Sequence, residues 1–197
     1  MWIYKKMLQF PVDVKKRDLK MANAIYDALG GAGGELSASM EYLHQRYTMP
    51  TGASIATLTD IGTEELGHLE MVATLIYQLT DGATIEEIKA AGFEGKYVPG
   101  GTGINLVDPS GVHWESKYIG TTSDPITDLT ISMAAEQRAR AGYNHLIDLT
   151  TDDDVRKVLA FLREREIIHF QRFGETLVEV QDYFEHERYF FMNENQA

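Results

Sequence analysis

The sequence contains no cysteine. This absence excludes disulfide scaffolds, zinc–thiolate sites, iron–sulfur clusters and thiol nucleophiles. Any bound metal ion must therefore be held by Glu, Asp and His, which suit manganese, non-haem iron, magnesium or calcium. Basic residues are also few, because 18 Lys and Arg stand against 30 Asp and Glu, a net charge of −12. This charge and the lack of a basic run argue against a nucleic-acid partner.

Long apolar runs are absent as well. No uninterrupted apolar stretch approaches the ~20 residues of a membrane-spanning helix, so we expect no membrane partner. The first residues lack the apolar core and cleavage site of a signal peptide, which predicts synthesis in the cytoplasm without one. Hydrophobic residues make up 44% of the 197, enough for one folded domain.

Helical periodicity and glycine-rich breaks divide the chain into segments. Thr84 and the pair Asp124-Pro125 are typical of helix starts. Seven of the 17 glycines lie in 92–124, where we expect short extended pieces and no helix. The expected segments are a lead-in with a packing helix (1–33), a first helical hairpin (34–80), a crossover (81–124), a second hairpin (125–183) and a tail (184–197).

Two helical hairpins joined by one long crossover make the ferritin-like form of the four-helix bundle. A crossover of this length is unusual inside a compact domain unless it spans a bundle. The sequence therefore predicts an all-α, single ferritin-like domain with an extra N-terminal helix.

The second hairpin repeats metal-ligand and tyrosine residues of the first at one fixed offset of 101 residues. General similarity between the hairpins is weak, so the matches concentrate on side chains that can bind metal. The matching pairs include Glu35 and Glu136, Glu65 and Glu166, His68 and His169, Tyr42 and Tyr143, and His44 and His145.

The spacing predicts that the four glutamates meet in one layer of the bundle. The first turn, near Pro50, lies midway between Glu35 and Glu65, and the second hairpin has the same spacing about Thr151. At a constant helical rise, the glutamates of each hairpin are level with each other. Four buried carboxylates without cations would repel one another, and two divalent metal ions remove that repulsion. One Glu from each of two helices and Glu-x-x-His from each of the others is the known dimetal pattern of this fold.

Other side chains near this layer have two interpretations. Glu64 lies four residues before His68 and competes with Glu65 as a ligand, but its counterpart at the repeat offset is Arg165, which favours Glu65. Tyr42 and Tyr143 lie two helical turns beyond the first glutamate of each hairpin. They are either hydrogen-bond donors to the carboxylates or ordinary core tyrosines.

Long blocks of the sequence carry a family resemblance. They are MWIYKKMLQFPV, GGAGGELSASMEYLHQRYTMP, DIGTEELGHLEM, DPITDL, AAEQRARAGY and FLREREIIHFQRFGE. Through these blocks the chain resembles the manganese catalases, in particular their CotJC spore-coat branch, over essentially its whole length.

The resemblance implies a centre of two manganese ions per subunit that disproportionates hydrogen peroxide to water and oxygen, cycling between Mn2+ and Mn3+. It implies that Glu65 bridges the ions and that Glu166 lies just outside the ligand set and relays protons. The repeat alone makes Glu166 a ligand, so the two interpretations differ on this residue. The ligands implied by the family are Glu35, Glu65, His68, Glu136 and His169.

The resemblance also implies a homohexamer, a location in the spore coat and contacts with other coat proteins. One position departs from the family pattern, because some members have a basic residue where this chain has Ala135. Arg138 and Arg140 follow Glu136 by two and four residues, spacings that turn them in other directions.

Two further functions fit the same residues. One is a structural spore-coat protein in which metal stabilises the bundle without turnover; Ala135 favours it. The other is a di-iron oxidase or iron-storage protein, which needs Glu166 as an additional ligand.

Overall fold

The computed structural model describes residue 5, residues 7–93, residue 96 and residues 103–194. No helix in these ranges has the length and apolar character needed to cross a membrane. The elements are α1 (Leu19–Gly30), α2 (Glu35–Gln45), η1 (Arg46–Thr48), α3 (Gly52–Thr80), α4 (Ile85–Ala90), η2 (Ser116–Tyr118), α5 (Pro125–Leu149) and α6 (Asp153–Glu194).

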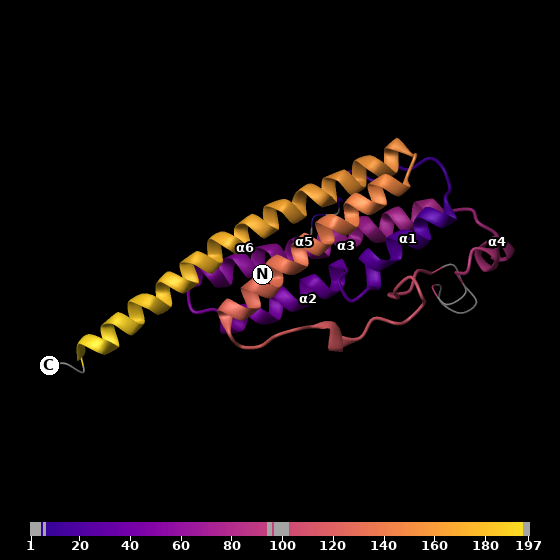
Figure 1. The fold of residues 1–197 in the computed structure, drawn as a ribbon. Coiled ribbons are helices and arrows are strands. Elements are labelled where there is room, and N and C mark those ends of the chain that lie inside the picture. Colours follow the sequence, from indigo (N-terminus) through magenta and orange to yellow (C-terminus); the bar gives the residue numbers. More distant parts are fainter. Residues whose placement is uncertain (1–4, 6, 94–95, 97–102, 195–197) are drawn as a thin grey trace.

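Helices α2, α3, α5 and α6 run alongside one another in a four-helix bundle (Figure 1). Helices α2 and α3 form one hairpin and α5 and α6 the other, while α1 packs on α3 and also contacts α2 and α5. This arrangement confirms the predicted all-α, ferritin-like bundle with an extra N-terminal helix.

Polar side chains fix where the helices begin. The Thr51 hydroxyl accepts a hydrogen bond from the Ser54 N–H at the start of α3, and the Ser54 hydroxyl accepts one from the Thr51 N–H. Thr84 makes the same kind of capping box at α4, and Asp124 caps α5 with Pro125 at its first position. The helix starts predicted at Thr84 and Asp124 are confirmed.

The crossover leaves α3, passes through α4 and returns along the bundle to α5 (Figure 1). It touches α1 at Gly30, where a Cβ atom would lie 2.5 Å from the backbone nitrogen of Val107. Only glycine permits this approach. Near its other end, the Gly120 N–H donates to Glu41 and the Thr122 N–H donates to the buried Asp128. The crossover is therefore fastened at both ends of the bundle.

Two parts of the structure differ from expectation. Ser116–Tyr118 forms a turn of 3-10 helix, η2, where extended chain was expected. Helix α6 continues past 183 to Glu194, through most of the predicted tail, and its end projects beyond the other helices (Figure 1). The sequence after Gly174 contains neither glycine nor proline, so nothing stops the helix at 183.

Two apolar clusters lie along the bundle, one on each side of a polar layer. On α3, Leu58 and Ile61 belong to one cluster and Met71 begins the other. Between them, α3 carries the buried Glu65 and His68. Helix α6 has the reverse order, with Val155–Leu162 in one cluster and Phe173 in the other. Burying the two clusters therefore carries the polar layer into the interior.

Candidate metal centre

Six acidic and histidine side chains, drawn from all four bundle helices, lie in this polar layer. Helix α2 contributes Glu35 and α5 contributes Glu136, each at most 4% exposed. Helices α3 and α6 each contribute one Glu-x-x-His pair, at most 2% exposed. These pairs are Glu65 with His68 and Glu166 with His169.

Glu65 lies between the two histidines. One of its oxygens is 2.6 Å from His68 Nδ1 and the other is 2.8 Å from His169 Nδ1. The two imidazole rings stack with their centroids 5.4 Å apart. Both histidines therefore direct Nδ1 toward the centre of the layer.

The remaining carboxylates surround this trio. Glu35 lies 3.8 Å and Glu166 3.9 Å from His68 Nδ1, and Glu136 lies 3.6 Å from His169 Nδ1. One donor atom from each of Glu65, His68, Glu166 and His169 lies within 4.8 Å of the others. Glu166 is therefore as close to the centre as the carboxylates of α2 and α5.

Two buried tyrosines connect the hairpins at this layer. The Tyr42 hydroxyl on α2 donates to Glu136 Oε1 on α5, at 2.5 Å. Tyr143 on α5 donates in the same way to Glu35 Oε1 on α2. Because the tyrosines and the glutamates are each 101 residues apart, the two bonds are equivalent under the approximate two-fold symmetry of the repeat. Each bond holds one carboxylate in a fixed orientation.

Burial and mutual repulsion keep protons on this layer in the metal-free protein. Burial and the charge of Glu65 raise the pKa of Glu35 to about 7. Burial and the charges of Glu65 and Glu136 raise the pKa of Glu166 well above its usual range. Burial opposes protonation of His169, but the negative charge of Glu65 together with the contacts to Glu136 and Glu64 outweighs it and raises the pKa to about 11. A cation that enters this layer therefore displaces protons.

The unsatisfied atoms in the layer fit a metal ion. Among the described residues, Glu136 Oε2 and Glu166 Oε1 are buried without a hydrogen-bond partner. Glu65 Oε1 and His169 Nδ1 lie 2.8 Å apart but lack the geometry of a hydrogen bond. Buried polar atoms of this kind are rare and indicate a missing ligand. Carboxylate oxygens with imidazole nitrogens and no thiolate form a donor set that suits manganese or non-haem iron.

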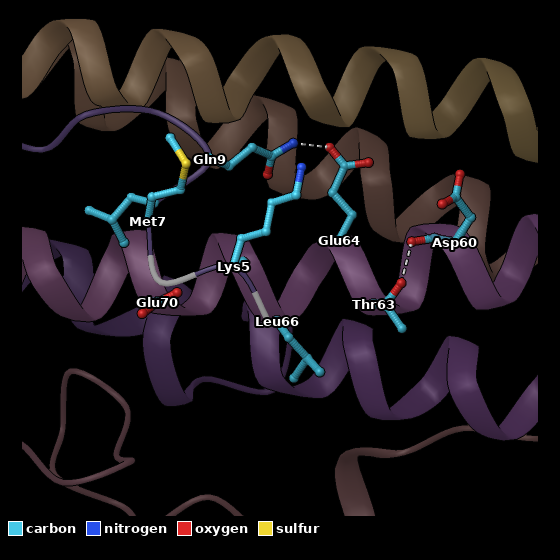
Figure 2. Close-up of a pocket in the computed structure, with 10 residues that line it drawn as sticks. Lys5, Met7, Gln9, Asp60, Thr63, Glu64, Leu66 and Glu70 are labelled. Carbon is cyan, nitrogen blue, oxygen red and sulfur yellow. Dashed lines mark hydrogen bonds between the residues drawn. The ribbon is translucent and has the colours of Figure 1, made fainter. Parts of the chain in front are cut away.

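The sequence left open whether Glu64 competes with Glu65 as a ligand, and the structure places Glu64 on the outer side of the two histidines. Its carboxylate faces the Nε2 atoms of both histidines, at 3.6 Å from His68 and 3.2 Å from His169. Arg165 donates to it through Nε at 2.6 Å and through Nη2 at 3.1 Å. Gln9, in the lead-in, also donates to it at 2.6 Å (Figure 2). Burial alone would raise the pKa of Glu64, but the nearby His169 and His68 rings and the hydrogen-bonded Arg165 guanidinium hold it far below its usual range.

A small cavity of about 90 Å³ reaches the layer from the side of α2 and α5. Its lining includes Glu35, Glu136 and Glu166, together with Tyr118 from η2, Ala135 and Arg138. The expectation that Arg138 turns away from this region is wrong, because its long side chain reaches the cavity although its backbone position lies off the ligand face.

The helical bundle defines a ferritin-like protein, and its buried Glu/His layer is a group that could hold a metal ion. The family described as "Manganese containing catalase" matches residues 1–188. The chain belongs to this family.

Individual relatives agree. The chain is 46% identical to Protein CotJC of Bacillus subtilis over 90% of this chain and 93% of that protein. It is 36% identical to a probable manganese catalase of Clostridium acetobutylicum over 87% and 76% of the two chains. The crystal structure of KatB, a manganese catalase from Anabaena, superposes with a TM-score of 0.84 at 32% identity, covering 92% of this chain and 81% of that one.

The thermal stability of the metal-free protein should fall as the pH rises from about 5 to about 8. Glu35 and His169 have higher pKa values in the folded protein than in the unfolded chain, so folding takes up protons in this range. The lowered pKa of Glu65 affects stability only below its usual value of 4.5. Thermal unfolding after treatment with a chelator measures the effect.

Saturating manganese should remove most of this pH dependence, because the ions replace the protons. Glu35→Gln should reduce the slope in the metal-free protein, since the substituted side chain cannot ionise. Stability of the metal-free protein that rises across the same range would contradict this electrostatic description of the layer.

Proposed function

We propose that this protein is a manganese catalase, which converts two molecules of hydrogen peroxide into two of water and one of oxygen. The observation that carries the proposal is the layer of four buried carboxylates and two histidines with unsatisfied donor atoms. This layer lies inside a chain of the manganese catalase family.

Two manganese ions per subunit would be held by Glu35, Glu65, His68, Glu136 and His169. The position of Glu65 supports a shared ligand, since each of its oxygens faces a different histidine. Glu35 and Glu136 each add one carboxylate from the opposite side of the layer. When bound, the ions supply Lewis acidity and store two electrons between the half-reactions.

Glu166 carries protons. Unlike Glu35 and Glu136, it has no tyrosine donor in the described part of the chain, and its Oε1 is buried there without a hydrogen-bond partner. It also lines the small cavity, where a peroxide molecule would arrive. Each half-reaction moves two protons, and the Glu166 carboxylate takes up and returns one of them. Tyr42 and Tyr143 fix Glu136 and Glu35 so that these two ligands keep their orientation.

The cellular setting follows from the similarity to CotJC. We place the protein in the spore coat, where it contacts other coat proteins. Residues 1–197 form one domain, and the subunits assemble as a homohexamer. Exposed apolar side chains on the bundle, among them Tyr77, Leu149 and Val178, are of the kind that subunit contacts cover.

Oxygen release from hydrogen peroxide tests the proposal directly. Protein purified from manganese-supplemented cells should release oxygen rapidly, in proportion to its manganese content, and azide should inhibit the release. The same protein loaded with iron is the control. No release from folded, manganese-loaded protein would instead favour the structural coat role, to which the similarity to CotJC and the absence of a basic residue at Ala135 point.

Glu166→Gln should lower the rate of oxygen release by about 10²- to 10⁴-fold, the usual contribution of a positioned proton carrier. The manganese content should stay at the level of the unsubstituted protein, because Glu166 is not a ligand. Metal analysis and oxygen electrode measurements on one preparation give both values.

Glu175→Gln, an exposed change on the same helix, is the matched control and should leave both values unchanged. Normal turnover in Glu166→Gln would remove this residue from the reaction. Loss of manganese would make it a ligand and favour a di-iron type of site.

A further inference from the structure

One carboxylate faces both histidines from outside the metal layer. Glu64 directly precedes Glu65 on α3, yet it lies on the opposite side of the imidazole rings, next to their Nε2 atoms. Both Nε2 atoms are buried without a hydrogen-bond partner in the metal-free protein. The side chain of Glu64 is 15% exposed, so it lies at the edge of the layer.

Two donors hold this carboxylate in place. The guanidinium of Arg165 on α6 binds both oxygens of Glu64, a paired arrangement that fixes orientation as well as position. The lead-in supplies the second donor, Gln9, which lies over α3 (Figure 2). The Glu64 carboxylate on α3 is thereby tied to α6 and to the lead-in.

The repeat explains why one carboxylate can serve two histidines. Glu64 and Arg165 are 101 residues apart, so they occupy equivalent positions in the two hairpins, as His68 and His169 do. Equivalent residues that touch must lie at the approximate two-fold axis between the hairpins. Two glutamates at this position would repel each other, whereas a glutamate and an arginine form an ion pair.

We propose that Glu64 is the positioning residue for both histidine ligands and that Arg165 and Gln9 hold it there. A histidine that binds metal through Nδ1 carries its remaining proton on Nε2, and a carboxylate that accepts this proton fixes the ring and its tautomer. Glu64 accepts from both rings, one with each oxygen. The inference rests on the proposed metal centre and adds one residue that controls both of its histidines.

Glu64→Gln distinguishes hydrogen-bond acceptance by the carboxylate from the packing of a side chain of this size. The amide has the size of the carboxylate, but its nitrogen can only donate, so it accepts a hydrogen bond from one histidine and not from both. The affinity for manganese, measured with manganese chloride against a competing fluorescent chelator, should fall by about 10- to 100-fold. The electron paramagnetic resonance spectrum of bound Mn2+ should change as well.

Asp60→Asn is the matched control. It breaks another ion pair between α3 and α6, with Arg172, that does not reach the histidines. This variant should bind manganese like the unsubstituted protein. The thermal midpoint of each metal-free variant, measured in parallel, reports any loss of folding.

The exchange Glu64→Arg with Arg165→Glu gives a second, independent test. It moves the carboxylate to the equivalent position on α6, from which it again faces both Nε2 atoms. The exchanged protein should bind manganese more tightly than Glu64→Gln, although Gln9 loses its partner. An exchanged protein that binds no better than Glu64→Gln would contradict the placement at the shared axis.

The outcomes also separate this inference from the proposed function. Failure of the unsubstituted protein to bind manganese would overturn the metal centre and the positioning role together. Tight binding by the unsubstituted protein, with equal affinity and an unchanged spectrum in Glu64→Gln, would overturn the positioning role alone.

Discussion

Repulsion among buried carboxylates is the constraint on which the rest of this structure depends. Glu35, Glu65, Glu136 and Glu166 lie in one layer, each at most 4% exposed. An isolated ionised carboxylate in such surroundings costs many kcal/mol, so protons or cations must accompany the group. In the metal-free protein the protons are held by the histidines and by raised pKa values at Glu35 and Glu166. Metal ions would replace these protons, so the same buried layer that lies inside the bundle also favours metal binding.

Because of the approximate two-fold repeat, the two hairpins form this layer by making the same contacts twice. Tyr42 and Tyr143 each cross to the other hairpin and hold its first glutamate. Glu65 lies between the two histidines on the inner side, and Glu64 lies between them on the outer side. Symmetry is broken where identical charges would meet, at the contact between Glu64 and Arg165. It is also broken at the α3–α6 pair Glu65 and Glu166, which have different surroundings although their positions are equivalent.

The repeat made the fold and the layer predictable, because 3.6-residue periodicity and equal spacing about each turn determine which side chains are level. The interactions that depend on long side chains were not predictable. Arg138 reaches the cavity although its backbone position points away, and Gln9 reaches Glu64 from a segment without periodicity. The end of α6 was placed too early, at 183, although the backbone meets no glycine or proline there. The opposite charges of Glu64 and Arg165 at one offset were a signal that could have predicted their contact.

Anomalous diffraction at the manganese absorption edge, from crystals of the manganese-loaded protein, tests the dinuclear centre most directly. We expect two manganese peaks per subunit in the layer, with Glu65 between them, His68 and His169 bound through Nδ1, and Glu166 close by but uncoordinated. A single peak, or two peaks that include Glu166 among their ligands, would contradict the assignment of five ligands and one proton carrier.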